Sequence, residues 1–273
     1  MRIKYILFIT AVLVLSCKEI KQPANLSQLL AQGQWIDLSY DFSHSTLYWP
    51  NNPTGFKLDT QFNGITARGF YYSSNQFCSP EHGGTHIDAP VHFAKGKLAV
   101  DQIPLNQLIN KAVVIDVSST VNDNADYQII PSDVEAWEQK HGKIPDGVML
   151  FFRTGWGKYY PDPLKYLGTA DKGAAAIPKL HFPSIHPDLA TWLVKNRKIS
   201  AIGLDAASVD YGQSVDFKTH QIIYAENIIG FENLANLEKL PPTGAFIIAL
   251  PMKIKDGTGG PLRIVAWGSN ELK

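Results

Sequence analysis

The stretch GVMLFFRT (Gly147–Thr154) holds five consecutive apolar residues between a glycine and an arginine. A short apolar run of this kind, rich in branched and aromatic side chains, is typical of a strand buried on both faces. Four more runs of the same character surround it: KAVVIDVS (Lys111–Ser118), ISAIGLDA (Ile199–Ala206), GAFIIALPMKI (Gly244–Ile254) and, after the turn KDGTGG, PLRIVAWGS (Pro261–Ser269). We therefore predict a sheet built on these five strands.

Two segments between the predicted strands have the pattern of helices. PSDVEAWEQKHG begins with Pro131, can be capped by Ser132 or Asp133, and ends at Gly142. HPDLATWLVKNRK (His186–Lys198) is amphipathic, because its apolar residues recur at helical spacing. Alternating strands and helices in the middle of the chain, with strands at both ends, predict a mixed α/β fold whose partly parallel sheet carries flanking helices.

The composition limits the number of domains that the chain can form and the classes of partner that it can bind. The 273 residues are 45% hydrophobic, which is enough for a sizeable core, and no internal repeat divides them. We predict one domain over residues 35–273. Lys+Arg and Asp+Glu are equal at 25 each, without a basic stripe, so nucleic acid is not an expected partner.

The N-terminus has the pattern of an export signal. MRIKYILFITAVLVLSC places two basic residues before a short apolar run, which is shorter than the roughly 20 residues a bilayer-spanning helix needs. Its end, VLSC, resembles a bacterial lipoprotein signal, which favours a lipidated Cys17 over ordinary secretory cleavage. We expect a signal peptide at 1–16, a tether at 17–34 with a short helix at Leu26–Ala31, and an extracytoplasmic protein held to a membrane only by its lipid. Cys78 then has no partner and is predicted to be a small, partly buried residue.

The stretch CSPEHGGTHIDAPVHF (Cys78–Phe93) concentrates nitrogen and oxygen donors. Gly83 and Gly84 argue against a helix and permit a backbone that turns His82 and His86 toward one point. His86 and Asp88 are two apart, so they share a face of an extended segment. Two imidazoles and a carboxylate suit Zn²⁺, Mn²⁺ or Fe²⁺ and leave positions open for water.

A second concentration of candidate ligands lies at Asp216–Leu234. His220 is followed by apolar residues, and Glu232 follows the buried-looking run IIGF, where a carboxylate requires a cation or a donor. Glu226 is interpreted as a solvated helix end. Composition alone does not couple this segment to the first cluster.

The motif HGGTHIDAPVHF resembles the signature of the cyclase family of metal-dependent hydrolases, which includes bacterial kynurenine formamidases and isatin hydrolases. WIDLSYDFSHSTLYWP is similar to the family's opening, LFFRTGWG to its central strand, and GLDAASVD with the following His and ENL to its second metal-binding region. The resemblance covers the chain from Trp35 to the final strand. It implies a swivelling β/β/α-type fold and a homodimer or homotetramer.

The same resemblance assigns roles to particular residues. It implies one or two divalent ions, Zn or Mn, held by His82, His86, Asp88, His220 and Glu232, with Asp88 bridging when two are bound. It makes His92 the general acid/base and Trp49 an aromatic contact to the small-molecule substrate.

The function implied is hydrolysis of an amide-like C–N bond by metal-activated water, in an N-formyl arylamine or a cyclic amide such as isatin. The long aromatic loop Asn51–Ser79 leaves the choice between these substrates open, and we expect it to stack on a flat aryl substrate together with Trp49. Arg153 and Trp156 are equally compatible with the pocket wall and with a strand end packed on the core. The alternative class is a lipid-anchored, metal-dependent solute-binding protein without turnover, which would not need His92.

Overall fold

The computed structural model describes residues 25–52, 54–122 and 124–269. The predicted signal peptide, Cys17 and the tether up to residue 24 therefore lie outside the described residues. Within the described ranges, the expected short helix is α1 (Leu26–Gln32), and no helix is long and apolar enough to cross a membrane.

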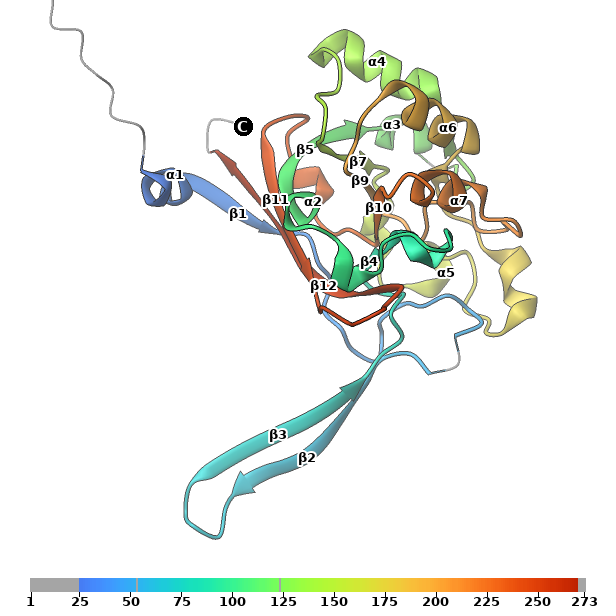
Figure 1. Ribbon diagram of the computed structural model, residues 1–273. Coiled ribbons are helices and arrows are strands. Elements are labelled where there is room, and N and C mark those ends of the chain that lie inside the picture. The colour runs from blue at the N-terminus through green and yellow to red at the C-terminus, as the bar shows by residue number, and fades with distance from the viewer. Residues whose placement is uncertain (1–24, 53, 123, 270–273) are drawn as a thin grey trace, which may run out of the picture.

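Seven strands form a closed mixed β-barrel (Figure 1). They follow one another around the barrel in the order β12 (Gly259–Ser269), β11 (Ala245–Pro251), β5 (Ile109–Asp116), β7 (Met149–Arg153), β9 (Ala201–Leu204), β10 (Ile229–Glu232) and β4 (His86–Asp88). β5, β7, β9 and β10 run parallel, the other neighbours are antiparallel, and β4 pairs with both β10 and β12 to close the ring. An eighth strand, β1 (Gly33–Asp37), pairs with β12 outside the ring.

All five predicted strands and both predicted central helices are confirmed, and the fold class is mixed α/β. The closure of the sheet was not predicted. It depends on β4, which has only three residues and lies inside the histidine motif, so its composition gives no strand signal.

The apolar runs are explained by two cores, one on each face of the barrel wall. Met149 and Phe151 point into the barrel with side chains from all seven strands, whereas Leu150 and Phe152 pack outward against the helices. A strand buried on both faces cannot alternate apolar and polar residues, which is why GVMLFFRT is continuous.

Helices cover the outer face of the parallel strands (Figure 1). The main ones are α4 (Pro131–His141), α6 (Pro187–Asn196) and α7 (Lys218–Tyr224). The shorter helices are α3 (Ser118–Val121), α5 (Pro163–Tyr166) and α2 (Leu105–Leu108), of which α2 lies beside β11 and β5. A separate parallel pair consists of β6 (Gln128–Ile129) and β8 (Ser184–Ile185). Asp133 accepts a hydrogen bond from the Ile130 N–H at 2.9 Å at the start of α4, and Gly142 ends that helix with a positive φ of 83°.

The segment predicted as an aromatic loop is a long hairpin instead. β2 (Lys57–Ile65) and β3 (Tyr71–Cys78) pair only with each other and project from the barrel as an arm (Figure 1). The prediction of a loop was wrong because both faces of the arm mix aromatic and polar residues, so the period of two is hidden. Cys78, at its base, is exposed rather than partly buried.

Candidate metal centre

Two glycines shape the backbone that carries the first cluster. Gly83 and Gly84 have φ angles of 144° and 57°, in the region that L side chains rarely adopt. A Cβ on Gly83 would lie 2.1 Å from the Tyr48 ring, so glycine is also required for space. The chain then enters β4, which places His86 and Asp88 on one face, as their spacing predicted.

The second cluster reaches the first through strand pairing. In the antiparallel register of β10 and β4, Glu232 lies directly opposite His86. Opposite residues on an antiparallel pair project to the same face at close range. Helix α7, which precedes β10, brings His220 to the same point, a coupling that the family resemblance implied and that composition alone did not.

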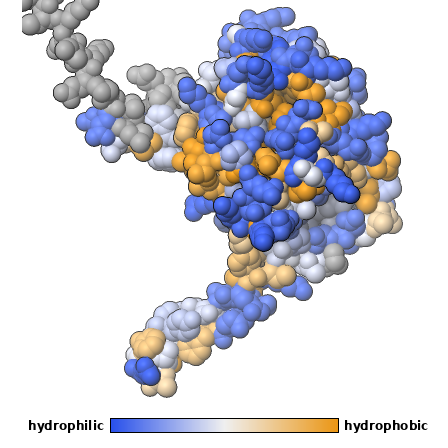
Figure 2. Space-filling model, viewed as in Figure 1, coloured by the Kyte–Doolittle hydropathy of each residue, from blue (hydrophilic) through white to orange (hydrophobic). Residues whose placement is uncertain are grey.

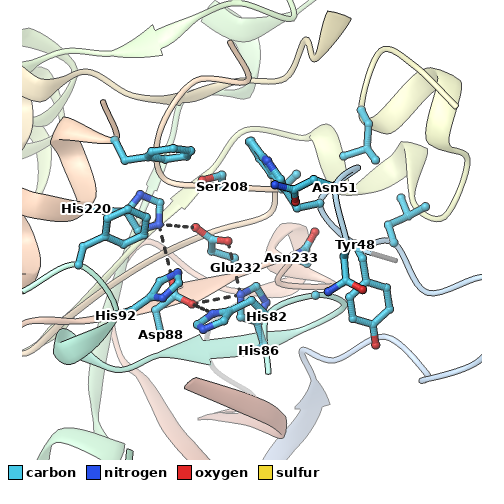
Figure 3. Close-up of a pocket in the computed structure, with 18 residues that line it drawn as sticks. Tyr48, Asn51, His82, His86, Asp88, His92, Ser208, His220, Glu232 and Asn233 are labelled. Carbon is cyan, nitrogen blue, oxygen red and sulfur yellow. Dashed lines mark hydrogen bonds and ion pairs between the residues drawn. The ribbon is translucent and has the colours of Figure 1, made fainter. Parts of the chain in front are cut away.

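The Asp88 carboxylate is at the centre of the arrangement (Figure 3). Its Oδ1 lies 2.7 Å from His82 Nδ1 and 3.1 Å from His86 Nε2, and its Oδ2 lies 3.4 Å from His220 Nε2. Glu232 completes the ring, with its two carboxylate oxygens 3.5 Å from His86 Nε2 and 3.3 Å from His220 Nε2. The structure thus gathers all five predicted ligands around one small volume.

Further residues, which sequence reasoning missed, orient these ligands. Asp210 accepts a hydrogen bond from His220 Nδ1 at 2.6 Å, and Tyr224 donates its hydroxyl to Asp88 Oδ2 at 2.6 Å. His82 Nε2 contacts Thr258 Oγ1 at 2.8 Å, and that hydroxyl donates in turn to Glu81. Asp210 lies in the segment GLDAASVD, but only the fold shows that it faces His220. Such outer contacts fix the tautomer and orientation of a metal-binding imidazole.

The electrostatics of the cluster favour a cation. Burial lowers the pKa of His86, but the charges of Asp88 and Glu232 outweigh burial and raise it to about 9. The pKa of His220 is raised in the same way: burial lowers it, and hydrogen bonds to Asp210, Asp88 and Glu232 prevail. Burial raises the pKa of Asp88, yet its histidine neighbours hold it well below the usual range. The Asp88 carboxylate therefore stays ionised and attracts positive charge.

His92 differs from the other imidazoles. It sits at the end of a 3-10 helix (Pro90–His92), and its ring stacks on His82 with centroids 3.8 Å apart. Burial and the neighbouring histidines lower its pKa to about 3, against the opposing effect of Asp88. His92 is thus neutral at neutral pH.

A cavity of about 350 Å³ opens onto the cluster (Figure 3). Its apolar wall includes Trp49, Phe93 and Phe217, and its polar wall includes Ser208 and Asn233. Trp49 therefore lies where a substrate contact was predicted. The aromatic residues of the arm were expected here as well, and that expectation was wrong, because no residue of β2 or β3 lines the cavity.

The remaining candidates lie outside the cavity. Arg153 ends β7, pairs with Asp116 and donates to the Glu238 carbonyl oxygen at 3.3 Å. Trp156 is buried in the outer core and donates its ring N–H to the Tyr166 carbonyl at 2.9 Å. Glu226 is exposed beyond the end of α7, as interpreted from the sequence.

The donor set fits a divalent cation. There are two groups of three residues in which the potential ligand atoms all lie within 4.8 Å of one another: His82, Asp88 and His92, and His86, Asp88 and Glu232. Both groups include Asp88. Among the described residues that line the cavity there is no lysine or arginine to balance the two carboxylates. Imidazole with carboxylate suits Zn²⁺ and Mn²⁺, and none of the described residues lining the cavity is a cysteine that could make a closed structural zinc site.

Comparison with known proteins agrees with this chemistry. The model for the family described as "Putative cyclase" matches residues 36–211. Isatin hydrolase of Roseibium aggregatum is 34% identical over 206 residues, which cover 72% of this chain and 76% of that protein. Kynurenine formamidase of Salinibacter ruber is 28% identical over 233 residues, covering 84% and 95%. The solved structure of isatin hydrolase A from Ralstonia solanacearum has a TM-score of 0.80 at 32% identity and covers 91% of this chain and 98% of its own.

Proposed function

This chain belongs to the cyclase family, and we propose that it is a metal-dependent hydrolase that cleaves an amide-like C–N bond in a small aromatic substrate. The observation that carries the proposal is the convergence of three imidazoles and two carboxylates on the wall of one cavity, beside a neutral fourth imidazole. A solute-binding site would not need that fourth imidazole.

The ligand roles follow from the contacts of Asp88. His82, His86 and Asp88 would hold one ion, and His220 and Glu232 would hold a second ion that shares Asp88. We propose Zn²⁺ or Mn²⁺, as one or two ions per chain. When bound, such an ion supplies Lewis acidity and lowers the pKa of water toward roughly 7.

His92 moves the proton. Its neutral ring accepts a proton from the attacking water, whose oxygen forms a bond to the carbonyl carbon. The same proton then passes to the leaving nitrogen as the C–N bond breaks, giving an amine and a carboxylic acid, which releases its remaining acidic proton to solvent and becomes a carboxylate. General acid–base assistance of this kind contributes typically about 10²–10⁴-fold.

The cavity favours a flat substrate. Trp49, Phe93 and Phe217 offer ring faces and edges for an aryl group, while Ser208 and Asn233 are placed to hydrogen-bond its polar atoms. We place a cyclic amide of the isatin type first, since the isatin hydrolase relative is the more similar in sequence, and an N-formyl arylamine second.

Turnover assays test the proposal directly. The purified protein, supplied with Zn²⁺ or Mn²⁺, should hydrolyse isatin or N-formylkynurenine, and a chelator should abolish the reaction. Ligand binding that depends on metal but never leads to product would favour the solute-binding alternative and refute the hydrolase.

The His92→Ala variant tests the proton-transfer role. It should retain metal and lose activity by about 10²–10⁴-fold. His181→Ala is a matched control, because that histidine is exposed and contacts only surface groups such as Asp126, at 2.8 Å. Equal activity in His92→Ala and the control would remove His92 from the mechanism.

The proposal also includes the location of the protein, its oligomeric state and its type of fold. The sequence pattern at Cys17 supports a lipid-anchored extracytoplasmic protein. The family resemblance supports a homodimer or homotetramer and a swivelling β/β/α-type arrangement of the barrel and its helices.

A further inference from the structure

Phe217 has a backbone conformation that its side chain disfavours. Its φ and ψ angles are 48° and 47°, in the left-handed region, where the Cβ of an L-residue lies too close to the following carbonyl oxygen. The other non-glycine residues with a positive φ in the described ranges are all asparagine or aspartate: Asn122, Asn227, Asn233, Asn236 and Asp256. Those two residue types adopt this conformation far more readily, whereas a bulky side chain there is an outlier. Phe217 is therefore the strained exception.

The turn at Phe217 explains the conformation but not the phenylalanine. The Phe217 N–H donates to the hydroxyl of the buried Ser214 at 3.0 Å, and the Phe217 carbonyl accepts from the Gln221 N–H at 3.1 Å as α7 begins. Both bonds use backbone atoms of residue 217, so glycine would make them with less strain. The reason for phenylalanine therefore lies in its ring.

The ring belongs to the cavity and to neither hydrophobic core. Phe217 is absent from the two clusters of apolar side chains that lie on either face of the barrel wall. Its ring lies near Trp49, Phe93 and His220, with centroids 6.1, 5.3 and 6.1 Å away, and all three residues line the cavity. The planes of Phe217 and Trp49 are inclined by 59°, so the two rings are not stacked on each other.

The ring is also not part of the apolar surface that the protein exposes to water. Many of the exposed large apolar side chains lie on the β2–β3 arm, which projects from the body of the molecule (Figure 2). Phe217 is not among the exposed side chains and is partly buried. What its ring can contact, beyond its three aromatic neighbours, is a molecule inside the cavity.

We propose that Phe217 determines the substrate specificity of the cavity by stacking on a planar aryl group, and that the strained backbone holds its ring in place for this contact. The inference rests on the proposed hydrolase, which gives the reacting bond but no reason for the strain. The favoured class is a cyclic amide fused to a benzene ring, in preference to a non-aromatic cyclic imide of similar size. Strained residues persist at binding sites when the surrounding structure fixes them.

The position of Phe217 in the chain connects this contact to the metal cluster. Phe217 immediately precedes α7 and lies three residues before His220, so the helix fixes the ring relative to that imidazole. Phe93 lies near both rings, with its centroid 5.3 Å from that of Phe217 and 4.5 Å from that of His220. An aryl group stacked on Phe217 is therefore held beside the cluster, where a fused amide bond has to lie in order to react.

Affinity for isatin tests the role of the ring. Metal-free protein is used, so that turnover does not interfere and the result does not depend on the proposed reaction. Phe217→Ala should raise the dissociation constant for isatin about 10-fold and that for succinimide, which has no aryl ring, by less than about 2-fold. Phe217→Tyr keeps the ring and should bind isatin as the unmodified protein does. Phe70→Ala, which removes an exposed ring at the turn of the arm, is the matched control.

Isothermal titration calorimetry gives these constants. Equal affinity for isatin in Phe217→Ala and Phe70→Ala, or no binding of isatin by the unmodified protein, would overturn the proposal. The proposed function fails in a different way. An unmodified protein that binds isatin through Phe217 but does not hydrolyse it with Zn²⁺ or Mn²⁺ would refute the hydrolase and support the specificity role.

Unfolding in urea tests the strain separately. Phe217→Gly and Phe217→Ala both remove the ring, but only glycine tolerates the left-handed backbone. The glycine variant should be the more stable, with an unfolding equilibrium constant on the order of 5-fold smaller. Val215→Gly and Val215→Ala are the control pair, because Val215 is 86% exposed and its φ is not positive, so alanine should be the more stable there. If alanine is the more stable at both positions, Phe217 is not strained and the proposal is wrong.

Discussion

Replacing Asp210 by asparagine should weaken metal binding while leaving the barrel folded. The Asp210 carboxylate accepts hydrogen bonds from His220 Nδ1 at 2.6 Å and from the N–H groups of Thr219 and His220 at 3.0 Å each. It is buried and lies on the side of the His220 ring opposite to Asp88 and Glu232. Its charge therefore keeps the proton on Nδ1 and leaves Nε2 free to face the cluster.

The magnitude follows from what asparagine retains. Its carboxamide oxygen can still accept from the two backbone N–H groups, so the start of α7 should survive. Its NH₂ group can donate to Nδ1, which favours the tautomer with the proton on Nε2, where it competes with a metal ion. Loss of an outer partner of a metal-binding histidine typically costs about 10- to 100-fold in metal affinity, or roughly 1.4–2.7 kcal/mol.

Competition of Zn²⁺ or Mn²⁺ between the protein and a fluorescent chelator measures this affinity. Asp188→Asn is the control, because Asp188 faces His186 Nδ1 at 3.5 Å but its side chain is 81% exposed. Melting curves of the metal-free proteins separate a folding defect from a binding defect. If Asp210→Asn binds metal as tightly as the control while Asp88→Asn does not bind, Asp210 does not orient His220 and the reasoning fails.

Three further predictions concern pH, packing and a partly buried ion pair. Because the pKa of His86 is raised to about 9, protonation of His86 stabilises the metal-free fold fully below pH 6.5, the ordinary pKa of histidine, and this stabilisation is lost as the pH rises through 9. The melting temperature of the metal-free protein should therefore fall between pH 6.5 and 9. The melting temperature of the metal-loaded protein should not fall in the same way, because metal affinity grows as the ligands lose protons. Gly230→Ala places a methyl group 2.1 Å from the Tyr224 hydroxyl and should cost about 1–3 kcal/mol in denaturant unfolding; a cost that persists unchanged in a Tyr224→Phe background would contradict this cause. Glu138→Gln weakens the pair in which Arg197 Nε donates to Glu138 at 2.7 Å, and should lower the unfolding free energy by about 1.5–3 kcal/mol at pH 7. The pairing lowers the pKa of Glu138 below 4.5, so the difference in unfolding free energy between the variant and the unmodified protein should shrink as the pH falls through that lowered value. A difference that does not change with pH would exclude the ion pair as its source.

The sequence by itself determined the strands, the helices and most of the candidate site. GVMLFFRT and the four similar segments are rich in consecutive apolar residues. Such a strand is stable in water only when both of its faces are buried. The motif around His82, His86 and Asp88 is local, because glycine conformations and the two-residue period act over a few residues. Local constraints of this kind are visible in a sequence.

Only the tertiary structure decided how the sheet closes and how the two halves of the site meet. β4 is too short to signal a strand, yet its pairing with β10 sets Glu232 opposite His86. Asp210 contacts His220, which lies 10 residues away in the sequence, and Thr258 contacts His82, which lies 176 residues away. The arm was missed for a related reason: its period is masked because neither face is covered within one chain. Pairing, closure and burial are long-range properties, and they arise only when the chain is folded.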